Sequence, residues 1–231
     1  MVNSKVRKNS DKSIILLSGG LDSLVALGVC KNKYNIELAL TFDYGQKSVK
    51  YEIEASANIC RYYQIQHEII ELNWLKEITN TALVSSKEIP KENFGTDMSA
   101  KSVWVPNRNG LFLNIAAAYA DSYNYKYIIF GANKDEGKTF PDNTEEFRNE
   151  ISEVFKRSTL VHPKVVAPLI NYSKDDIVRV ALENNVPLEL LRSCYTGNAE
   201  HCGICESCAH LKKALKNNGA QKYLDILFGE K

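Results

Sequence analysis

Short apolar runs alternate with stretches of helical periodicity along most of the chain. This alternation predicts an α/β fold with a mostly parallel sheet, because helices with one apolar face cover both faces of buried strands. Strands are expected at residues 13–17, 38–42, 68–72, 126–131 and 165–168. Helices are expected at residues 22–30, 46–64 and 111–123, and two more should begin at Asn143 and Ser173, where Glu146 and Asp176 complete capping-box patterns.

Two parts of the chain depart from this alternation. Residues 79–107 show no clear period and contain two prolines, and irregular stretches of that length in a compact domain usually serve function. Residues from about 190 onward are rich in cysteine and then helical. We therefore expect a large α/β domain over residues 1–189 and a small C-terminal subdomain over residues 190–231.

Length and composition narrow the class of protein. A chain of 231 residues buries a sizeable core, and 44% hydrophobic with 25% charged residues is ordinary for a globular protein. The 29 basic and 28 acidic residues leave a net charge of +1, which argues against a strongly basic nucleic-acid binder. No apolar run approaches the roughly 18 residues of a membrane span, and the first run, 14–17, is too short for a signal-peptide core. The sequence therefore predicts a cytoplasmic protein without a membrane segment.

The loop after the first expected strand has the sequence Ser-Gly-Gly-Leu-Asp-Ser at residues 18–23. Two glycines let the backbone approach an anion, and the N-terminus of the following helix adds N–H donors and partial positive charge. Neither the Walker A sequence nor the G-x-G-x-x-G fingerprint is present. The loop predicts a phosphate site, and a plain strand–turn–helix connection is the alternative.

Six cysteines in a cytoplasmic protein are expected to be thiols or metal ligands before disulfides. Four of them crowd into one short segment, at Cys194, Cys202, Cys205 and Cys208. Four thiolates form the usual closed tetrahedral site of a structural zinc, and an iron–sulfur cluster is the alternative. His201 and His210 flank a complete ligand set and are not expected to bind the metal. Cys30 and Cys60 fall at apolar helix positions, so we expect buried thiols there.

The glycine loop resembles that of the pyrophosphatase-loop enzymes, which split ATP between the α and β phosphates. Together with the cysteines it points to one branch, and the sequence resembles the QueC family over nearly its whole length. The resemblance rests on six stretches in the family's order and spacing: SGGLDS at 18–23, TFDYGQ at 41–46, VPNRN at 105–109, GANKDEGKTFPDN at 131–143, APLINYSKDDI at 167–177 and SCYTGNAEHCGICESC at 193–208. It implies a Rossmann-like adenine nucleotide alpha-hydrolase fold with a zinc-binding helical C-terminal appendage.

The resemblance also implies an activity, which is the conversion of 7-carboxy-7-deazaguanine and ammonia to 7-cyano-7-deazaguanine in queuosine or archaeosine synthesis. ATP with Mg²⁺ is the implied co-substrate, and one structural Zn²⁺ per chain is the implied metal. Adenylation gives the carboxylate a leaving group, ammonia forms the amide, and a second adenylation allows loss of AMP to leave the nitrile. One phosphate loop can serve both steps by positioning and electrostatic stabilisation.

Residue roles follow from the matching motifs. The residues expected to bind ATP are Leu17, Ser18, Gly19, Gly20, Leu21, Asp22, Ser23, Phe42 and Gln46. The catalytic candidates are Ser18, Asp22, Ser23, Arg108 and Lys174. The candidates for the deazaguanine acid are Tyr44, Arg108, Asp135, Phe140 and Asp142, with Glu136 behind them. Asp142 is the first choice for the N–H donors of the guanine-like face. The alternatives are a structural ion pair for Arg108, a solvated loop for the acids and an exposed lysine for Lys174.

One departure from the family pattern limits this transfer. Residues 140–144 are Phe-Pro-Asp-Asn-Thr where bacterial members carry Tyr-Pro-Asp-Cys-Arg, so no role of that cysteine or arginine applies here. The sequence looks closer to archaeal members. The expected partners are small molecules, with no direct nucleic acid, and the resemblance implies a homodimer.

Three alternatives to this function stay open. The first is a tRNA-thiolating or amide-forming enzyme on the same loop. The second is a QueC-like enzyme of antiviral gene clusters, whose acceptor is a protein. The third is a zinc-ribbon module for nucleic acid.

Overall fold

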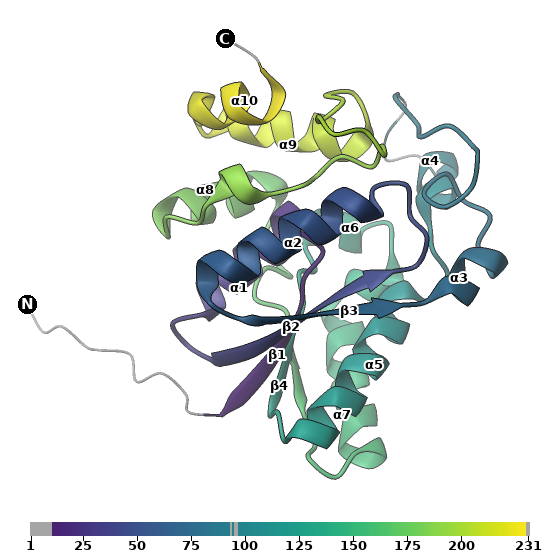
Figure 1. Ribbon diagram of the computed structural model, residues 1–231, viewed down its shortest axis with the longest axis vertical. Helices are drawn as coiled ribbons and strands as arrows, with labels where there is room; N and C mark the ends of the chain where they lie inside the picture. The colour runs from purple at the N-terminus through teal and green to yellow at the C-terminus, as the bar shows by residue number, and fades with distance from the viewer. Residues whose placement is uncertain (1–10, 93, 95–96, 230–231) are drawn as a thin grey trace, which may run out of the picture.

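The computed structural model describes residues 11–92, 94 and 97–229. Five strands form one sheet that lies between two layers of helices (Figure 1). The strands are β1 (Lys12–Leu16), β2 (Asn35–Asp43), β3 (Gln66–Glu71), β4 (Tyr127–Ile129) and β5 (Lys164–Val166). None of the helices in these described ranges is long and apolar enough to cross a membrane.

The sheet is parallel throughout, in the order β3-β2-β1-β4-β5. The chain moves outward from β1 to β3, returns across the sheet, and continues from β4 to β5. The strand order therefore reverses between β1 and β4, and open α/β sheets bind ligands at the carboxyl ends of the strands at such a point. This confirms the α/β class and the parallel sheet that the sequence predicts.

The helices follow the predicted pattern with shifted ends. The longer ones are α1 (Leu21–Cys30), α2 (Val49–Tyr63), α5 (Arg108–Tyr123), α7 (Glu145–Ser158), α8 (Lys174–Glu183), α9 (Glu206–Asn217) and α10 (Gln221–Phe228). The shorter ones are α3 (Asn73–Ile78), α4 (Asp97–Val103), α6 (Lys134–Gly137) and the 3₁₀ turns η1 (Pro141–Asn143) and η2 (Leu188–Leu190).

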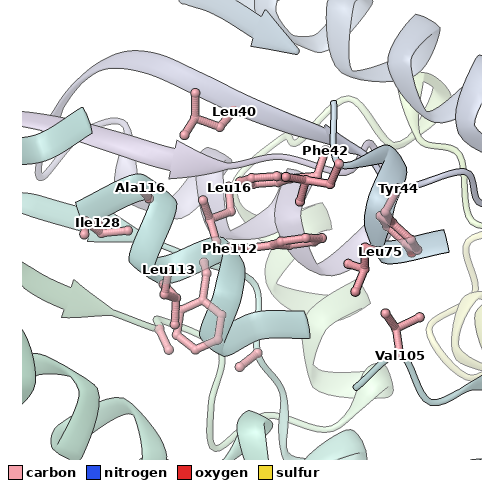
Figure 2. Packing of buried hydrophobic residues seen from close by; sticks show 14 of the residues in the cluster. Leu16, Leu40, Phe42, Tyr44, Leu75, Val105, Phe112, Leu113, Ala116 and Ile128 are labelled. Atoms are coloured by element: carbon pink, nitrogen blue, oxygen red, sulfur yellow. The ribbon is translucent and has the colours of Figure 1, made fainter. Parts of the chain in front are cut away.

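Alternate residues of β1 face opposite layers, as the two-residue period of a strand requires. Ile14 and Leu16 pack with α5 and α7, in the cluster that Figure 2 shows around Phe112 and Leu113. Ile15 packs with α1, α2, α8, α9 and α10 in the other layer. A strand buried on both faces explains the unbroken apolar run that identifies it in the sequence.

The C-terminal helices pack on this second layer. Leu211, Leu215, Leu224 and Leu227 are buried there with residues of α1 and α8. The apolar face of α10 thus packs on the chain's own core. The division at residue 190 stays a prediction, because the segment shares a hydrophobic cluster with the sheet domain.

One expected boundary was wrong, and one stretch without a clear period contains a helix. The helix expected to begin at Asn143 begins at Glu145, because Thr144 caps it by accepting a hydrogen bond from the N–H of Phe147 at 3.1 Å. Asn143 lies in the preceding 3₁₀ turn. The stretch 79–107 contains the helix α4, whose seven residues are too few to show a period. The capping box of Ser173 and Asp176 at the start of α8 is confirmed.

Candidate functional site: two adjoining cavities at the carboxyl edge of the sheet

The glycine loop joins β1 to α1 at the carboxyl edge of the sheet. Gly19 has a φ of +74°, and a Cβ there would lie 2.9 Å from the Cβ of Ala55 in α2, so both backbone conformation and space require glycine. Gly20 caps α1 in an extended conformation. The first N–H groups of α1 have no partners within the helix, and they remain available to an anion at its N-terminus.

Two serine hydroxyls hold the loop in shape. The Oγ of Ser23 donates to the carbonyl of Gly20 at 3.1 Å and lies 3.2 Å from the Oγ of Ser18. The N–H of Ser18 donates to the Oγ of Ser23 at 3.3 Å. The loop is therefore preorganised, which lowers the cost of ordering it around a phosphate.

The end of β4 lies directly against the start of α1. A Cβ at Gly131 would lie 2.7 Å from the carbonyl carbon of Asp22 and from the nitrogen of Ser23. These neighbours are backbone atoms and cannot rotate away. Glycine at position 131 thus brings the GANKDEG segment beside the glycine loop.

Lys174, the first residue of α8, lies between two carboxylates from distant parts of the chain. Its Nζ is 2.5 Å from the Oδ2 of Asp22 and 2.9 Å from the Oε1 of Glu136, and 18% of its side chain is exposed. Burial by itself would lower the pKa of Lys174, but the attraction of the two carboxylates is stronger and raises the pKa above its ordinary value. The ammonium is therefore charged at neutral pH. Lys174 is therefore not the exposed lysine of the alternative prediction.

One oxygen of Asp22 is left without a partner. The Oδ1 of Asp22 is buried and accepts no hydrogen bond within the described part of the chain. Burial raises the pKa of this carboxyl, and Lys174 opposes the rise. An unpartnered buried carboxylate oxygen is costly unless a ligand satisfies it, so Asp22 fits a contact with the hydrated Mg²⁺ that accompanies ATP.

A first cavity of about 200 Å³ opens beside the glycine loop. It is lined by most residues predicted to bind ATP, namely Leu17, Ser18, Gly20, Leu21, Asp22, Ser23 and Phe42. Tyr44, Arg108 and Lys174 also line it. The cavity therefore brings together segments that are far apart in sequence. Gly19 and Gln46 do not line it.

The TFDYGQ loop contains two of the residues predicted to bind ATP, Phe42 and Gln46. The ring of Phe42 stacks on Phe112 with centroids 3.9 Å apart (Figure 2), so one face of Phe42 is closed to adenine. The side chain of Gln46 is buried. Its Nε2 donates to the carbonyl of Phe42 at 3.0 Å, and its Oε1 accepts from the N–H of Tyr44 at 3.0 Å. Gln46 thus shapes the loop from within.

A second cavity of about 140 Å³ adjoins the first. The two share several lining residues, which are Leu83, Arg108, Glu136, Asn143, Lys174, Tyr195, Ser207 and His210. The rest of the second cavity includes Trp104 and Phe140, whose rings stack with centroids 5.3 Å apart and an interplanar angle of 12°. The aromatic pair offers a flat wall to a planar ligand.

Arg108 belongs to both cavities and is the first residue of α5. Burial would lower the pKa of its guanidinium, but Tyr44, Glu136 and Asp142 raise it above the ordinary value. Burial also raises the pKa of Tyr44, so its hydroxyl stays protonated beside Arg108. A fixed guanidinium at the border of two cavities suits a carboxylate or a phosphate, whose geometry matches its fork.

Asp135 and Asp142 line the second cavity, as predicted, but both carboxylates already have partners. Asp142 accepts from the N–H of Asn109 at 3.2 Å and from the Nδ2 of Asn143 at 3.0 Å. Asp135 accepts from the N–H of Lys174 at 3.0 Å and pairs with Lys138 at 2.9 Å. These hydrogen bonds fix the start of α5 and of α8 around the cavity.

Four candidate functional residues were not predicted from the sequence. Glu52, in α2, lines the first cavity and accepts from Gln46 at 2.8 Å, and burial raises its pKa. The N–H of Arg192 donates to the carbonyl of Gly19 at 2.7 Å, and its guanidinium donates to carbonyls within 196–199. Tyr195 and His210 line both cavities. Tyr195 and His210 carried a signal in the sequence, which is their place near Cys194 and Cys208.

The four cysteines of the C-terminal segment come together as predicted. The Sγ atoms of Cys194, Cys202, Cys205 and Cys208 all lie within 4.8 Å of one another. The N–H of Cys202 donates to the sulfur of Cys194, and the N–H of Cys205 to that of Cys202, each at 3.3 Å. Such bonds stabilise thiolates, so the donor set fits one tetrahedral metal ion such as Zn²⁺.

The remaining cysteines and His201 lie outside this ligand set. Cys30 and Cys60 are each 2% exposed, and burial raises the pKa of both thiols to about 12. They are inert core thiols. The Nε2 of His201 accepts from the N–H of Ser193 at 3.0 Å, which holds the two ends of the cysteine loop together.

Comparison with known proteins gives a consistent result. A family model described as "Queuosine biosynthesis protein QueC" matches residues 12–219. The 7-cyano-7-deazaguanine synthase of Methanosarcina barkeri is 46% identical, over 91% of this chain and 96% of that protein. The 7-cyano-7-deazaguanine synthase of Carboxydothermus hydrogenoformans is 49% identical, over 90% of this chain and 100% of that protein.

A solved structure extends the likeness to the fold. The U34-tRNA thiolase NcsA from Methanococcus maripaludis, with its 4Fe–4S cluster, superposes with a TM-score of 0.51 at 17% identity. The match covers 97% of this chain and 72% of that one. At such low identity the likeness shows a common fold and nothing about the reaction.

Proposed function

The chain belongs to the QueC family, and from this premise we propose that it converts 7-carboxy-7-deazaguanine and ammonia to 7-cyano-7-deazaguanine with two molecules of ATP. The observation that carries the proposal is the pair of adjoining cavities. One of them contains the glycine loop, and the other has an aromatic wall with carboxylates. Arg108 and Lys174 lie on the border that both cavities share, where the acid and the α-phosphate of ATP would meet.

The first half of the proposed reaction activates the acid. A carboxylate oxygen attacks the α-phosphorus of ATP, pyrophosphate leaves, and an acyl-adenylate forms. Ammonia then attacks the carbonyl carbon, AMP leaves, and one proton is lost as the amide forms. Arg108 and Lys174 would hold the carboxylate and the α-phosphate in line, and the N–H groups at the start of α1 would stabilise charge on the leaving pyrophosphate.

The second half repeats the activation on the amide. The amide oxygen attacks the α-phosphorus of a second ATP, pyrophosphate leaves, and an N–H proton is lost. Departure of AMP and of the remaining N–H proton then leaves the carbon–nitrogen triple bond. Each activation adenylates one of the two oxygens on the same carboxyl carbon, so one phosphate loop beside one base cavity is sufficient for both.

The remaining expectations are parts of the same proposal. Asp22, through its unpartnered oxygen, would take a water ligand of the Mg²⁺ that accompanies ATP. The four cysteines would hold one structural Zn²⁺, since a closed set of four sulfurs leaves no position for a reacting water. The substrates would be small molecules with no direct contact to nucleic acid. The resemblance supports a cytoplasmic homodimer in queuosine or archaeosine synthesis.

The test is incubation of the purified protein with 7-carboxy-7-deazaguanine, ATP and ammonium. Mass spectrometry should find the nitrile, and nucleotide analysis should find AMP and pyrophosphate in a ratio of two to each nitrile. Release of ADP and phosphate would contradict the proposal, as would sulfur incorporation into tRNA without nitrile formation. An adduct on a protein acceptor, with ammonia unused, would instead identify an enzyme of the protein-modifying type.

A further inference from the structure

Four carboxylates line the second cavity, and three of them already have protein partners. Glu136 pairs with Lys174 at 2.9 Å. Asp135 pairs with Lys138 and accepts from the N–H of Lys174. Asp142 accepts from Asn109 and Asn143. These three groups are used to hold the walls of the cavity in place.

The fourth carboxylate, Glu206, is different. Its side chain takes part in no hydrogen bond or ion pair with any residue that the structure describes, although it lines the cavity and is half-buried. It is the first residue of α9, and Cys205 caps that helix. Cys205 and Cys208 lie on either side of it in the chain, so a metal held by the four cysteines would fix the backbone that carries Glu206.

Glu206 also lies on the part of the second cavity away from the nucleotide. Arg108 and Lys174 border both cavities, whereas Glu206, Trp104 and Phe140 line the second one alone. A planar acid whose carboxylate meets Arg108 at the border would rest its ring on the stacked aromatic pair. The edge of the ring opposite the border would then face the residues that belong only to the second cavity.

We propose that Glu206 is the residue that selects a guanine-type base, by accepting the ring N–H and the exocyclic amino group of 7-carboxy-7-deazaguanine. Two adjacent donors match the two oxygens of one carboxylate, and a carboxylate without protein partners loses no existing bond when it binds them. This assignment rests on the proposed function and replaces Asp142 as the first choice for this contact.

The test compares two ligands. One is 7-carboxy-7-deazaguanine, and the other is the matching hypoxanthine-type acid, which lacks the exocyclic amino group. The wild-type enzyme should prefer the amino-bearing acid by about 100-fold in kcat/KM, because the second ligand leaves a carboxylate oxygen unpaired. In Glu206→Gln this preference should fall to less than about tenfold. The glutamine amide has only one acceptor oxygen, and its NH₂ group would face one of the two N–H donors of the base. The KM for ATP should stay unchanged.

Three further variants sharpen the result. Glu200→Gln changes an exposed carboxylate in the same cysteine-rich segment and should behave as wild type. Glu206→Asp keeps the carboxylate and should keep the preference, even with a higher KM. Asp142→Asn should raise the KM for both acids alike. Bound metal and the thermal midpoint, measured for every variant, separate lost recognition from lost folding.

The outcomes are distinct. An unchanged preference in Glu206→Gln would overturn the role of Glu206, and a preference abolished in Asp142→Asn alone would return that role to Asp142. A wild-type enzyme that converts neither acid would overturn the proposed function and this assignment together. A wild-type enzyme that makes the nitrile while Glu206→Gln retains full discrimination would overturn this assignment alone.

Discussion

The Nζ of Lys174 lies 2.5 Å from the Oδ2 of Asp22, although 152 residues separate them in the chain. This contact ties the start of α8 to the glycine loop. Glu136 pairs with the same ammonium from a third segment. The charge of the phosphate site is thus set by three groups that only the fold brings together.

Replacing Lys174 by Met should remove activity. The variant loses the cation at the border of the two cavities and leaves Asp22 and Glu136 facing each other, so kcat should fall at least about 100-fold. The free energy of unfolding should fall by about 2 kcal/mol. This loss is smaller than for a fully buried ion pair, because 18% of the Lys174 side chain is exposed. Steady-state assays and urea unfolding measure the two effects. Lys138→Met, which removes a more exposed partner of Asp135, is the matched control, and equal losses in both variants would contradict the role of Lys174.

Truncation of Asp142 to Ala should weaken binding of the deazaguanine acid much more than binding of ATP. The side chain holds the N–H of Asn109 next to Arg108, and its loss leaves that donor unpaired at a cost of about 1–3 kcal/mol. We expect the KM for the acid to rise about tenfold or more, with the KM for ATP within twofold. Calorimetric titration of each ligand gives an independent measure, and equal weakening of both would contradict this position for Asp142.

The stability that the start of α8 gives to the folded protein should depend on pH through Asp176. Hydrogen bonds from Ser173 and Arg179 lower the pKa of Asp176 from 3.8 to about 2. A lowered pKa in the folded state stabilises the protein above pH 3.8, and this contribution is lost as the pH falls through about 2. Asp176→Ala should therefore lower the thermal midpoint by about 2–4 °C at pH 7, as the loss of a helix cap does, and by progressively less below pH 3.8.

Thermal unfolding across this pH range is the measurement. Glu150→Ala, at an exposed position of α7, should leave the midpoint unchanged at every pH. A difference between Asp176→Ala and wild type that stayed constant down to about pH 2 would show that the carboxylate charge has no part in the effect.

Replacing Cys205 by Ser should remove the metal and disturb both cavities. Metal analysis of the wild type should find about one zinc per chain and no iron, and the variant should lose most of it. The first turn of α9 would lose its anchor, so the KM for the deazaguanine acid should rise before the protein unfolds. Cys30→Ala removes a buried thiol outside the ligand set and should keep the full zinc content. Iron with a visible absorption band would instead identify an iron–sulfur cluster.

Several parts of the site could be predicted because their signals lie close together in the chain. The glycine loop occupies six consecutive residues between a strand and a helix, and the conformation of its backbone depends on those residues. The four cysteines fall within 194–208, so a short segment can close around one ion without help from the rest of the fold. In both cases the physical requirement is local, and the sequence pattern expresses it directly.

Other residues could not be placed in this way. The sequence left Lys174 undecided between a catalytic role and an exposed position, because its two partners come from other segments. Asp142 and Glu206 are both acidic residues in matching motifs, and only the hydrogen bonds to Asn109 and Asn143 distinguish them. Gln46 was expected at the nucleotide, yet its buried amide bonds to the carbonyl of Phe42 and the N–H of Tyr44.

The sequence by itself determined the α/β class, the phosphate loop, the cysteine site and the family, because strand and helix periods, glycine conformations and ligand spacing are properties of neighbouring residues. The tertiary structure alone decided which side chains share a cavity, since this depends on the strand order β3-β2-β1-β4-β5 and on the close approach at Gly131. It also decided which charges are already paired. Whether a carboxylate is free to bind a ligand depends on the donors that folding places around it, and that property has no sequence signature.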